Sequence, residues 1–319
     1  MCRNWLIALA LWSTLAAWAQ DYPSRAVRIV VPFAAGGPAD VYARFIAQRL
    51  QGALGQPFVV ENKPGAGALT GTQEAAQAAP DGHTLLMMSN THTVNETLIA
   101  NRPYQLMRDF APVAPVNYSD LVLVVHPSVP AANLGELLAL ARSKPGQLNY
   151  ASSGPGTPYH MAGELFKSLA NIDVVHVPYK GSSGARTDVL AGHVQMMFDA
   201  VTAMAPQVQS GKVKALATTG RTRSPILPDV PTVTEAGVPG YEAVIWLGVM
   251  APAKTPPAVL RRLNGEIARI VASPEVKQEW AAQGATTMTM SIEEFDRYLR
   301  ADIDKWAQIV RKAGIKAEN

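Results

Sequence analysis

The residues best suited to chemistry lie in two glycine-rich loops, each joining an apolar run to an amphipathic one. The first is IVVPFAAGGPADVYARF, from Ile29 to Phe45, and the second is LNYASSGPGTPYHMAGELF, from Leu148 to Phe166. A loop that opens a helix presents backbone N–H groups and the positive end of the helix dipole. Two such loops facing each other would form a cleft suited to an anion such as a carboxylate.

The first loop places Gly36 and Gly37 directly before Pro38. Glycine permits backbone torsions and close approach that other residues resist, which suits both a ligand-contacting loop and a tight strand-to-helix turn. Proline is favoured at the first position of a helix. Asp40 would stabilise the first helical turn, and because its charge would repel a carboxylate, a structural role is favoured over ligand contact.

The second loop adds the hydroxyl groups of Ser152, Ser153 and Thr157 just ahead of a predicted helix. Hydroxyl and amide donors can hold a carboxylate without a cationic partner. Thr157 or Ser153 could instead cap the helix, and capping is compatible with ligand contact. His160 lies in the first turn, where packing or capping is a more common role than ligand binding.

Further polar residues follow other predicted strands. In open α/β sheets, ligands bind beyond the carboxyl ends of the strands. Lys180 also lies at such a position, but it is typical of a solvated surface charge. The remaining candidates are Ser89, Asn90, Thr91, Tyr179, Gly181 and Asp199.

The sequence gives little support for a nucleotide, metal or catalytic site. The chain contains no P-loop, HExxH or GxSxG motif, and KPGAGALTG misses the dinucleotide fingerprint by one residue. The six histidines lack metal-ligand spacing, so we expect no metal and no cofactor. An exported hydrolase or transferase using Ser153 or Ser182 with His160 stays an alternative, although no base-orienting third group has a recognisable spacing.

The N-terminus is typical of a secretory signal peptide over residues 1–19. Arg3 supplies the positive region, Trp5 to Trp12 the apolar region, and Ala17 to Ala19 the cleavage site. A membrane anchor is the alternative, but the apolar stretch is shorter than the roughly 20 residues of a span. The single cysteine, Cys2, would leave with the signal, so the mature periplasmic chain would have no thiol for a disulfide or a metal.

Composition favours a globular protein of two ordinary domains. The 319 residues are 48% hydrophobic and 17% charged, with a formal net charge of +3. Because lysine and arginine are scattered and form no basic cluster, we expect no nucleic-acid partner.

Strand-like and helix-like runs alternate along the chain, which predicts a mainly parallel sheet covered by helices. The predicted strands cover residues 28–32, 58–61, 84–89, 120–126, 148–151, 173–177, 193–199, 213–218 and 241–250. The predicted helices cover residues 38–54, 67–79, 134–143, 185–191, 204–210, 256–271, 274–283 and 291–312. One more predicted helix follows the second loop and ends near residue 169.

The C-terminal helices have no strands of their own, so we expect them to return and cover the first α/β unit. Ser291 and Glu294 form a capping-box pattern at the start of the last helix. The return gives two chain crossings, near residues 118–125 and 241–249, and a hinge suited to closure. The predicted first lobe is residues 20–122 plus 247–319, and the second is residues 123–246.

Across nearly the whole mature chain, the sequence resembles the Bug (Bordetella uptake gene) family of periplasmic solute receptors, also called tripartite tricarboxylate transporter receptors. The segments that carry the resemblance are YPSRAVRIVVPFAAGGPAD, VVENKPGAGALTG, APDGHTLLM, NYASSGPGTPYHMAGELF, VPYKGSSGA and LPDVPTVTEAG. Ala34 and Ala35 stand where other members often have bulkier or Pro/Ser residues.

The resemblance implies an α/β, two-lobed, type II Venus-flytrap fold that closes on a small organic carboxylate. It implies ligand contact from the loops that start near Phe33 and Ser152, which adds Phe33, Ala35 and Gly156 to the candidates. It further implies delivery to a membrane permease and no catalysis. We expect a monomer, and a sensor that presents its closed form to a signalling partner stays an alternative.

Overall fold

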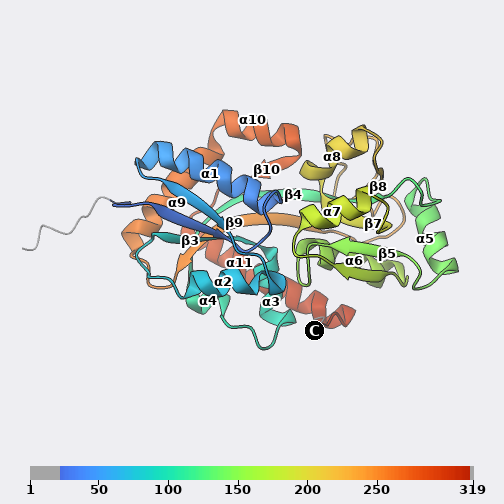
Figure 1. The fold of residues 1–319 in the computed structure, drawn as a ribbon, viewed down its shortest axis with the longest axis horizontal. Coiled ribbons are helices and arrows are strands. Elements are labelled where there is room, and N and C mark those ends of the chain that lie inside the picture. The colour runs from blue at the N-terminus through green and yellow to red at the C-terminus, as the bar shows by residue number, and fades with distance from the viewer. Residues whose placement is uncertain (1–21, 317–319) are drawn as a thin grey trace, which may run out of the picture.

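The computed structural model describes residues 22–316, and the predicted signal peptide with Cys2 lies outside them. Two α/β lobes lie side by side, joined through a shared sheet (Figure 1). The two-lobed α/β fold is thus confirmed. No helix between residues 22 and 316 combines the length and the apolar character needed to cross a bilayer.

Lobe 1 is built on three parallel strands in the order β2-β1-β3. Its strands are β1 (Val27–Val31), β2 (Phe58–Asn62) and β3 (Thr84–Ser89). Its helices are α1 (Pro38–Leu54), α2 (Leu69–Ala76), α3 (Asn90–Leu98), α4 (Leu106–Asp109), α9 (Pro257–Ala272), α10 (Pro274–Gln283) and α11 (Ile292–Ala313), with a 3-10 turn over Ala66–Ala68. Residues of α9 and α10 pack in one apolar cluster with residues of β1 and α1.

Lobe 2 repeats the pattern with β5 between β6 and β7. Its strands are β5 (Asn149–Ser152), β6 (Val175–Pro178), β7 (Met196–Ala200) and β8 (Lys214–Thr218). Its helices are α5 (Leu134–Ser143), α6 (Pro158–Ala170), α7 (Ser182–Leu190) and α8 (Val201–Gln209).

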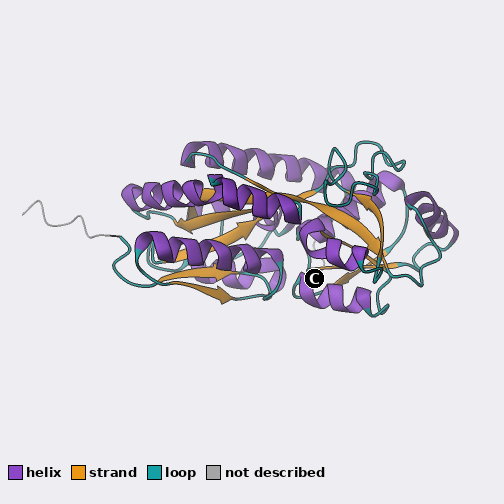
Figure 2. Ribbon diagram, turned by 90° about the horizontal axis from the view of Figure 1, so that it is seen from above, coloured by secondary structure: helices purple, strands orange, loops and turns teal. Residues whose placement is uncertain are grey.

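Two long strands connect the lobes (Figure 2). Strand β4 (Phe110–Val125) runs antiparallel to β9 (Val244–Pro252), and β10 (Ala285–Thr287) pairs with β4 on the lobe 1 side. The predicted strand over 120–126 was therefore too short. The part of β4 before residue 120 was not predicted, because Pro112 and Pro115 interrupt its strand pattern. The pairing register with β9 shifts beside both prolines, as it does at β-bulges.

Helix α3 was also missed, because its sequence NTHTVNETL lacks an apolar stripe. Its polar side chains are instead buried through hydrogen bonds to other segments. The Asn90 amide donates to the carbonyl of Val244 at 2.9 Å, and the Asn95 amide donates to that of Gly67 at 2.9 Å. Ser89 and His92 close a capping box at its start. Hydrogen bonds to distant segments, more than its own sequence pattern, therefore stabilise this helix.

The described residues form two apolar clusters in lobe 1 and two in lobe 2, and a fifth, small cluster joins the lobes. In it, Met161 of α6 in lobe 2 packs with Trp306 and Val310 of α11. Figure 1 shows α11 running from beneath lobe 1 toward lobe 2. The last helix therefore contacts both lobes.

Burial of Asp302 on α11 predicts a pH-dependent stability. Its carboxylate accepts a 2.5 Å hydrogen bond from the hydroxyl of Thr93, and burial raises the pKa of Asp302 to about 6. Because this pKa lies above the unfolded value of about 3.9, folding becomes more favourable as pH falls from 7.5 toward 4. We expect Asp302→Asn to raise the free energy of unfolding at pH 7.5 by up to about 3 kcal/mol, since each unit of the pKa shift corresponds to about 1.4 kcal/mol.

Denaturant unfolding between pH 5 and 8 would measure this difference. The exposed Asp304 on the same helix provides the control, Asp304→Asn, which removes the same formal charge. The prediction fails if the two variants show the same slope of unfolding free energy against pH.

Candidate functional site

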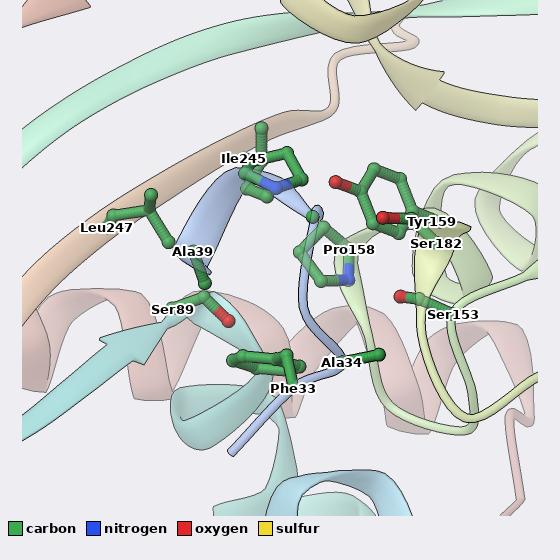
Figure 3. Close-up of a pocket in the computed structure, with 12 residues that line it drawn as sticks. Phe33, Ala34, Ala39, Ser89, Ser153, Pro158, Tyr159, Ser182, Ile245 and Leu247 are labelled. Carbon is green, nitrogen blue, oxygen red and sulfur yellow. The ribbon is translucent and has the colours of Figure 1, made fainter. Parts of the chain in front are cut away.

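Four helices begin around one cavity between the lobes (Figure 3). Helices α1 and α3 approach from lobe 1, and α6 and α7 from lobe 2. Strand β9 completes the wall. The lining residues are Phe33, Ala34, Gly37, Pro38, Ala39, Ser89, Ser153, Pro158, Tyr159, Ser182, Ile245 and Leu247.

Two of these helix starts have backbone amides that no side chain caps. Gly37 precedes α1 and Gly181 precedes α7, and neither helix has a side-chain cap in the described structure. In α1 the first intrahelical bond joins the Val41 amide to the carbonyl of Gly37, so the amide of Ala39 has no partner within the helix. Such amides and helix dipoles favour an anion, and the lining of the cavity contains no cationic side chain.

The other two helix starts are capped. The Ser89 hydroxyl accepts a hydrogen bond from the backbone amide of Thr91 at 3.2 Å and donates one to the Thr91 hydroxyl at 3.0 Å. Thr157 donates to the carbonyl of Gly154 at 2.7 Å and accepts from the amide of His160. Their hydroxyls are therefore engaged in holding the loops in place, which is the capping role that the sequence left open for Thr157.

The Tyr159 hydroxyl lies beside Ser182 in Figure 3. It is buried and makes no hydrogen bond of good geometry with the described residues, although the Ser182 side chain lies close enough to interact with it. Burial raises the pKa of Tyr159 well above its usual value, so it remains a neutral donor. A buried hydroxyl of this kind at the cavity is a donor that a ligand oxygen could satisfy.

No residue that lines this cavity carries a formal charge. Asp40 lies behind the α1 start, where it accepts from the amide of Gly36 at 2.9 Å and forms an ion pair with Arg44 at 2.9 Å. Burial alone would raise the pKa of Asp40, but these contacts outweigh it and lower the pKa. Asp40 thus remains ionised, paired within its own helix and loop.

Asp199 forms a second enclosed ion pair, in lobe 2. The Asp199 carboxylate is fully buried and accepts from Nε of Arg186 at 2.8 Å and from the amide of Ala200 at 2.8 Å. Burial raises the pKa of Asp199 although Arg186 opposes the shift. Asp199 does not line the cavity, and its pairing indicates a structural role.

The lobes touch through glycines, which leave little room between them. A Cβ atom added to Gly37 would lie 3.1 Å from Oγ of Ser182, and one added to Gly181 would lie 2.5 Å from Cβ of Ala34. The cavity has a volume of about 20 Å³, which is room for about one water molecule. The described conformation is therefore closed, and a ligand could enter only after the lobes separate.

A larger opening, which we name the vestibule, lies next to the cavity and shares Phe33 and Ser153 with it. The vestibule has a volume of about 440 Å³, and its wall includes Gly67, Tyr179 and Lys180. His92 packs edge-on against Phe33 with ring centroids 6.1 Å apart. Phe33 thus separates the cavity from the vestibule.

The structure brings some of the predicted residues together and leaves others apart. Phe33, Gly37, Ser89 and Ser153 line the cavity, while Thr157 and Tyr179 line the vestibule. The predicted residues that line neither space are Ala35, Gly36, Asp40, Asn90, Thr91, Ser152, Gly156, His160, Gly181 and Asp199.

The histidines near the second loop serve its conformation. Nδ1 of His160 accepts from the amide of Gly156 at 3.1 Å, and the His160 ring stacks on His176 with centroids 4.3 Å apart. Oγ of Ser152 lies 2.6 Å from Nε2 of His176. Burial lowers the pKa of His176 to about 4, so it is neutral at pH 7.

Sequence reasoning missed the wall provided by β9 and by the helix starts. Ile245 and Leu247 alternate along a strand that was predicted, so both could have been assigned to one face. Pro38 and Pro158 were recognisable as first helical residues. Which of these faces turns toward the cleft depends on how the lobes pack, and the sequence pattern does not contain that information.

Comparison with known proteins connects this geometry to a family. Residues 42–315 match the family described as the tripartite tricarboxylate transporter family receptor. The chain is 37% identical over 300 residues to the protein BugT of Bordetella pertussis, covering 93% of this chain and 92% of BugT.

Solved structures show the same likeness. Rpa4515 of R. palustris with adipate has a TM-score of 0.90 and 33% identity, and 93% of this chain and 100% of that chain are covered. MatC (Rpa3494) of Rhodopseudomonas palustris with bound malate has a TM-score of 0.86 and 32% identity, with coverage of 91% and 100%.

Proposed function

This chain belongs to the tripartite tricarboxylate transporter receptor family, and from that premise we propose that it captures a small organic carboxylate between its lobes and delivers it to a membrane permease. Two related structures are described as a periplasmic transporter and as the periplasmic binding protein BugD. Related structures hold adipate and malate, which are both carboxylates.

One observation supports this proposal most directly. Four helix starts surround a closed cavity, two of them without side-chain caps, and the described lining carries no charged side chain. Free amides and helix dipoles stabilise an anion, whereas a cation would find no counter-charge. The same site offers no nucleophile with a base beside it along the lining, so we propose binding without catalysis.

The proposed closure takes place about the two crossing strands. We assign residues 20–122 and 247–319 to one moving body and residues 123–246 to the other, and we propose that the receptor acts as a monomer. Ligand bound between the bodies would stabilise the closed form by contacting both.

Thermal melting with a panel of carboxylic acids tests the proposal. A ligand present at 100 times its dissociation constant stabilises the folded protein by about 2.7 kcal/mol, so a clear rise in melting temperature is expected for at least one acid. The matching amines and alcohols serve as controls and should give no rise. The absence of a shift with any acid in a broad panel would contradict the proposal.

A further inference from the structure

The lobes also meet beside the vestibule, where helix α3 holds a turn of lobe 1 against the second glycine-rich loop. We propose that Asn95 on α3 is a positioning residue for ligand capture, because it fixes this turn in the form on which lobe 2 closes. Asn95 lines neither the cavity nor the vestibule. The inference rests on the proposed function and extends it to a residue outside the ligand site.

Two glycines make this contact close. A Cβ atom added to Gly67 of lobe 1 would lie 2.8 Å from the carbonyl oxygen of Pro155 in lobe 2. One added to Gly156 of lobe 2 would lie 2.5 Å from Oδ1 of Asn95 and 3.2 Å from Cδ2 of Leu98 in lobe 1. Figure 1 shows α3 at the border between the lobes. The backbone therefore approaches the opposite lobe directly, as it does between the first loop and α7.

The turn of lobe 1 has an unusual backbone. Ala66 has φ 47° and Ala68 has φ 74°, and Gly67 between them has φ 61°. This left-handed region is open to glycine but strained for alanine, whose Cβ crowds the carbonyl oxygen. Strained residues of this kind persist only where the surrounding structure holds them. The turn therefore needs support from other segments to keep its shape.

Two side chains of α3 give that support. The Asn95 amide donates to the carbonyl of Gly67 at 2.9 Å. The Thr72 hydroxyl donates to the carbonyl of Ala68 at 2.7 Å and lies 2.9 Å from Nε2 of His92. Because the Thr72 proton is used for Ala68, His92 supplies the proton between them. Asn95, Thr72 and His92 are all buried, so water does not compete for these bonds.

Asn95 is itself held on its other side. The Tyr104 hydroxyl lies close enough to interact with it, and Gly156 of lobe 2 packs against its Oδ1. Without the amide donor, the strained turn would relax while the lobes are apart, and closure would have to restore it. The open form would gain stability relative to the closed form, so a ligand would bind more weakly and leave faster.

Calorimetry and stopped-flow kinetics of Asn95→Ala test the inference, with adipate and malate as probes. We expect affinity at least tenfold below that of the unchanged protein, with most of the loss in a faster dissociation rate. Asn264→Ala is the matched control, since its amide donates to the carbonyl of Val113 at 2.7 Å within lobe 1, and affinity should stay within about twofold. A variant that only folds less well would lower the binding stoichiometry and keep the dissociation rate.

Glycine variants examine the same contact from the turn. Gly67→Ala would bring its Cβ to 2.8 Å from the carbonyl oxygen of Pro155, so we expect at least tenfold weaker binding. Gly211→Ala is the control, because it introduces alanine at a similar φ of 71° but nothing lies within 4 Å of the new Cβ. Its affinity should be unchanged. Equal affinities in the two variants would overturn the inference.

A distance measurement separates the inference from the function on which it rests. Because Cys2 is the only cysteine and precedes the predicted cleavage site, spin labels at Gln48→Cys and Lys144→Cys can report the separation of the lobes without ligand. Both positions are exposed, one in each lobe. In this labelled protein, Asn95→Ala should shift the distances away from those of the closed form.

Each outcome decides one of the two claims. Unchanged affinity and dissociation rate in Asn95→Ala overturn the inference and leave the carboxylate receptor intact. Absence of binding by the unchanged protein, with both probes and with a broader panel of acids, overturns the proposed function. In that case the spin labels still decide the inference, and unchanged distances in Asn95→Ala overturn it as well.

Discussion

Gly181→Ala is expected to weaken ligand binding at least a hundredfold while leaving each lobe folded. The new Cβ would lie 2.5 Å from Cβ of Ala34 and 3.3 Å from its backbone nitrogen, across the interface between the lobes. Neither atom is the end of a flexible side chain, so the lobes would have to stay apart. The backbone of Gly181 is extended, with φ 162°, so the substitution introduces no torsional strain.

Two controls isolate closure as the cause. Gly184→Ala on the same helix would bring its Cβ only to 3.5 Å from Tyr179, an ordinary contact, and should preserve affinity. Adding Ala34→Gly to Gly181→Ala removes the opposing methyl group and should restore most of the binding. Calorimetry gives the affinities and circular dichroism the fold, and normal affinity in Gly181→Ala alone would show that binding does not need this contact.

Ser182→Asp is expected to abolish carboxylate binding, again by at least a hundredfold, or about 2.7 kcal/mol. It introduces a negative charge where the ligand carboxylate would bind, at the first residue of α7. Acidic residues near a helix start stabilise the helix by about 0.3–1 kcal/mol. Binding and thermal stability should therefore respond differently, because the helix is not damaged.

The charge and the position can be separated by two further variants. Ser183→Asp adds the same charge to the same helical turn, but Ser183 does not line the cavity, so affinity should fall less than fivefold. Ser182→Asn keeps the size without the charge and should lose less than tenfold. Ser182→Asp protein that still binds the preferred acid with normal affinity would move the anion site away from α7.

The elements with strong local signals could be predicted from the sequence. The prediction for α1 matched both ends, Pro38 and Leu54, because proline opens the helix and Gly55 closes it in the left-handed conformation. The Ser291 and Glu294 capping box that opens α11 was likewise confirmed. These signals are local in sequence and do not depend on the rest of the fold.

Long-range partners explain what the sequence patterns did not reveal. Helix α3 depends on bonds from Asn90 to β9 and from Thr93 to α11, so its own residues predict little. The same holds for the site. Glycine-rich loops predict helix starts, but the sequence pattern does not show which of these starts face one cavity. The lining by Ile245 and Leu247 requires knowledge of where β9 crosses.

The return of the chain to lobe 1 has a consequence for how the protein is made. The core around Ile29 and Leu85 is completed by Leu247, Leu263 and Trp280, which are synthesised much later. At about 5–20 residues per second, the first strand would wait roughly ten to fifty seconds before Trp280 is made, with its apolar face uncovered. The elements from α5 to β8 follow one another in the chain, so they can fold in that interval. A nascent chain cut short before Trp280 would therefore carry one finished lobe and one that is prone to aggregation and dependent on chaperones.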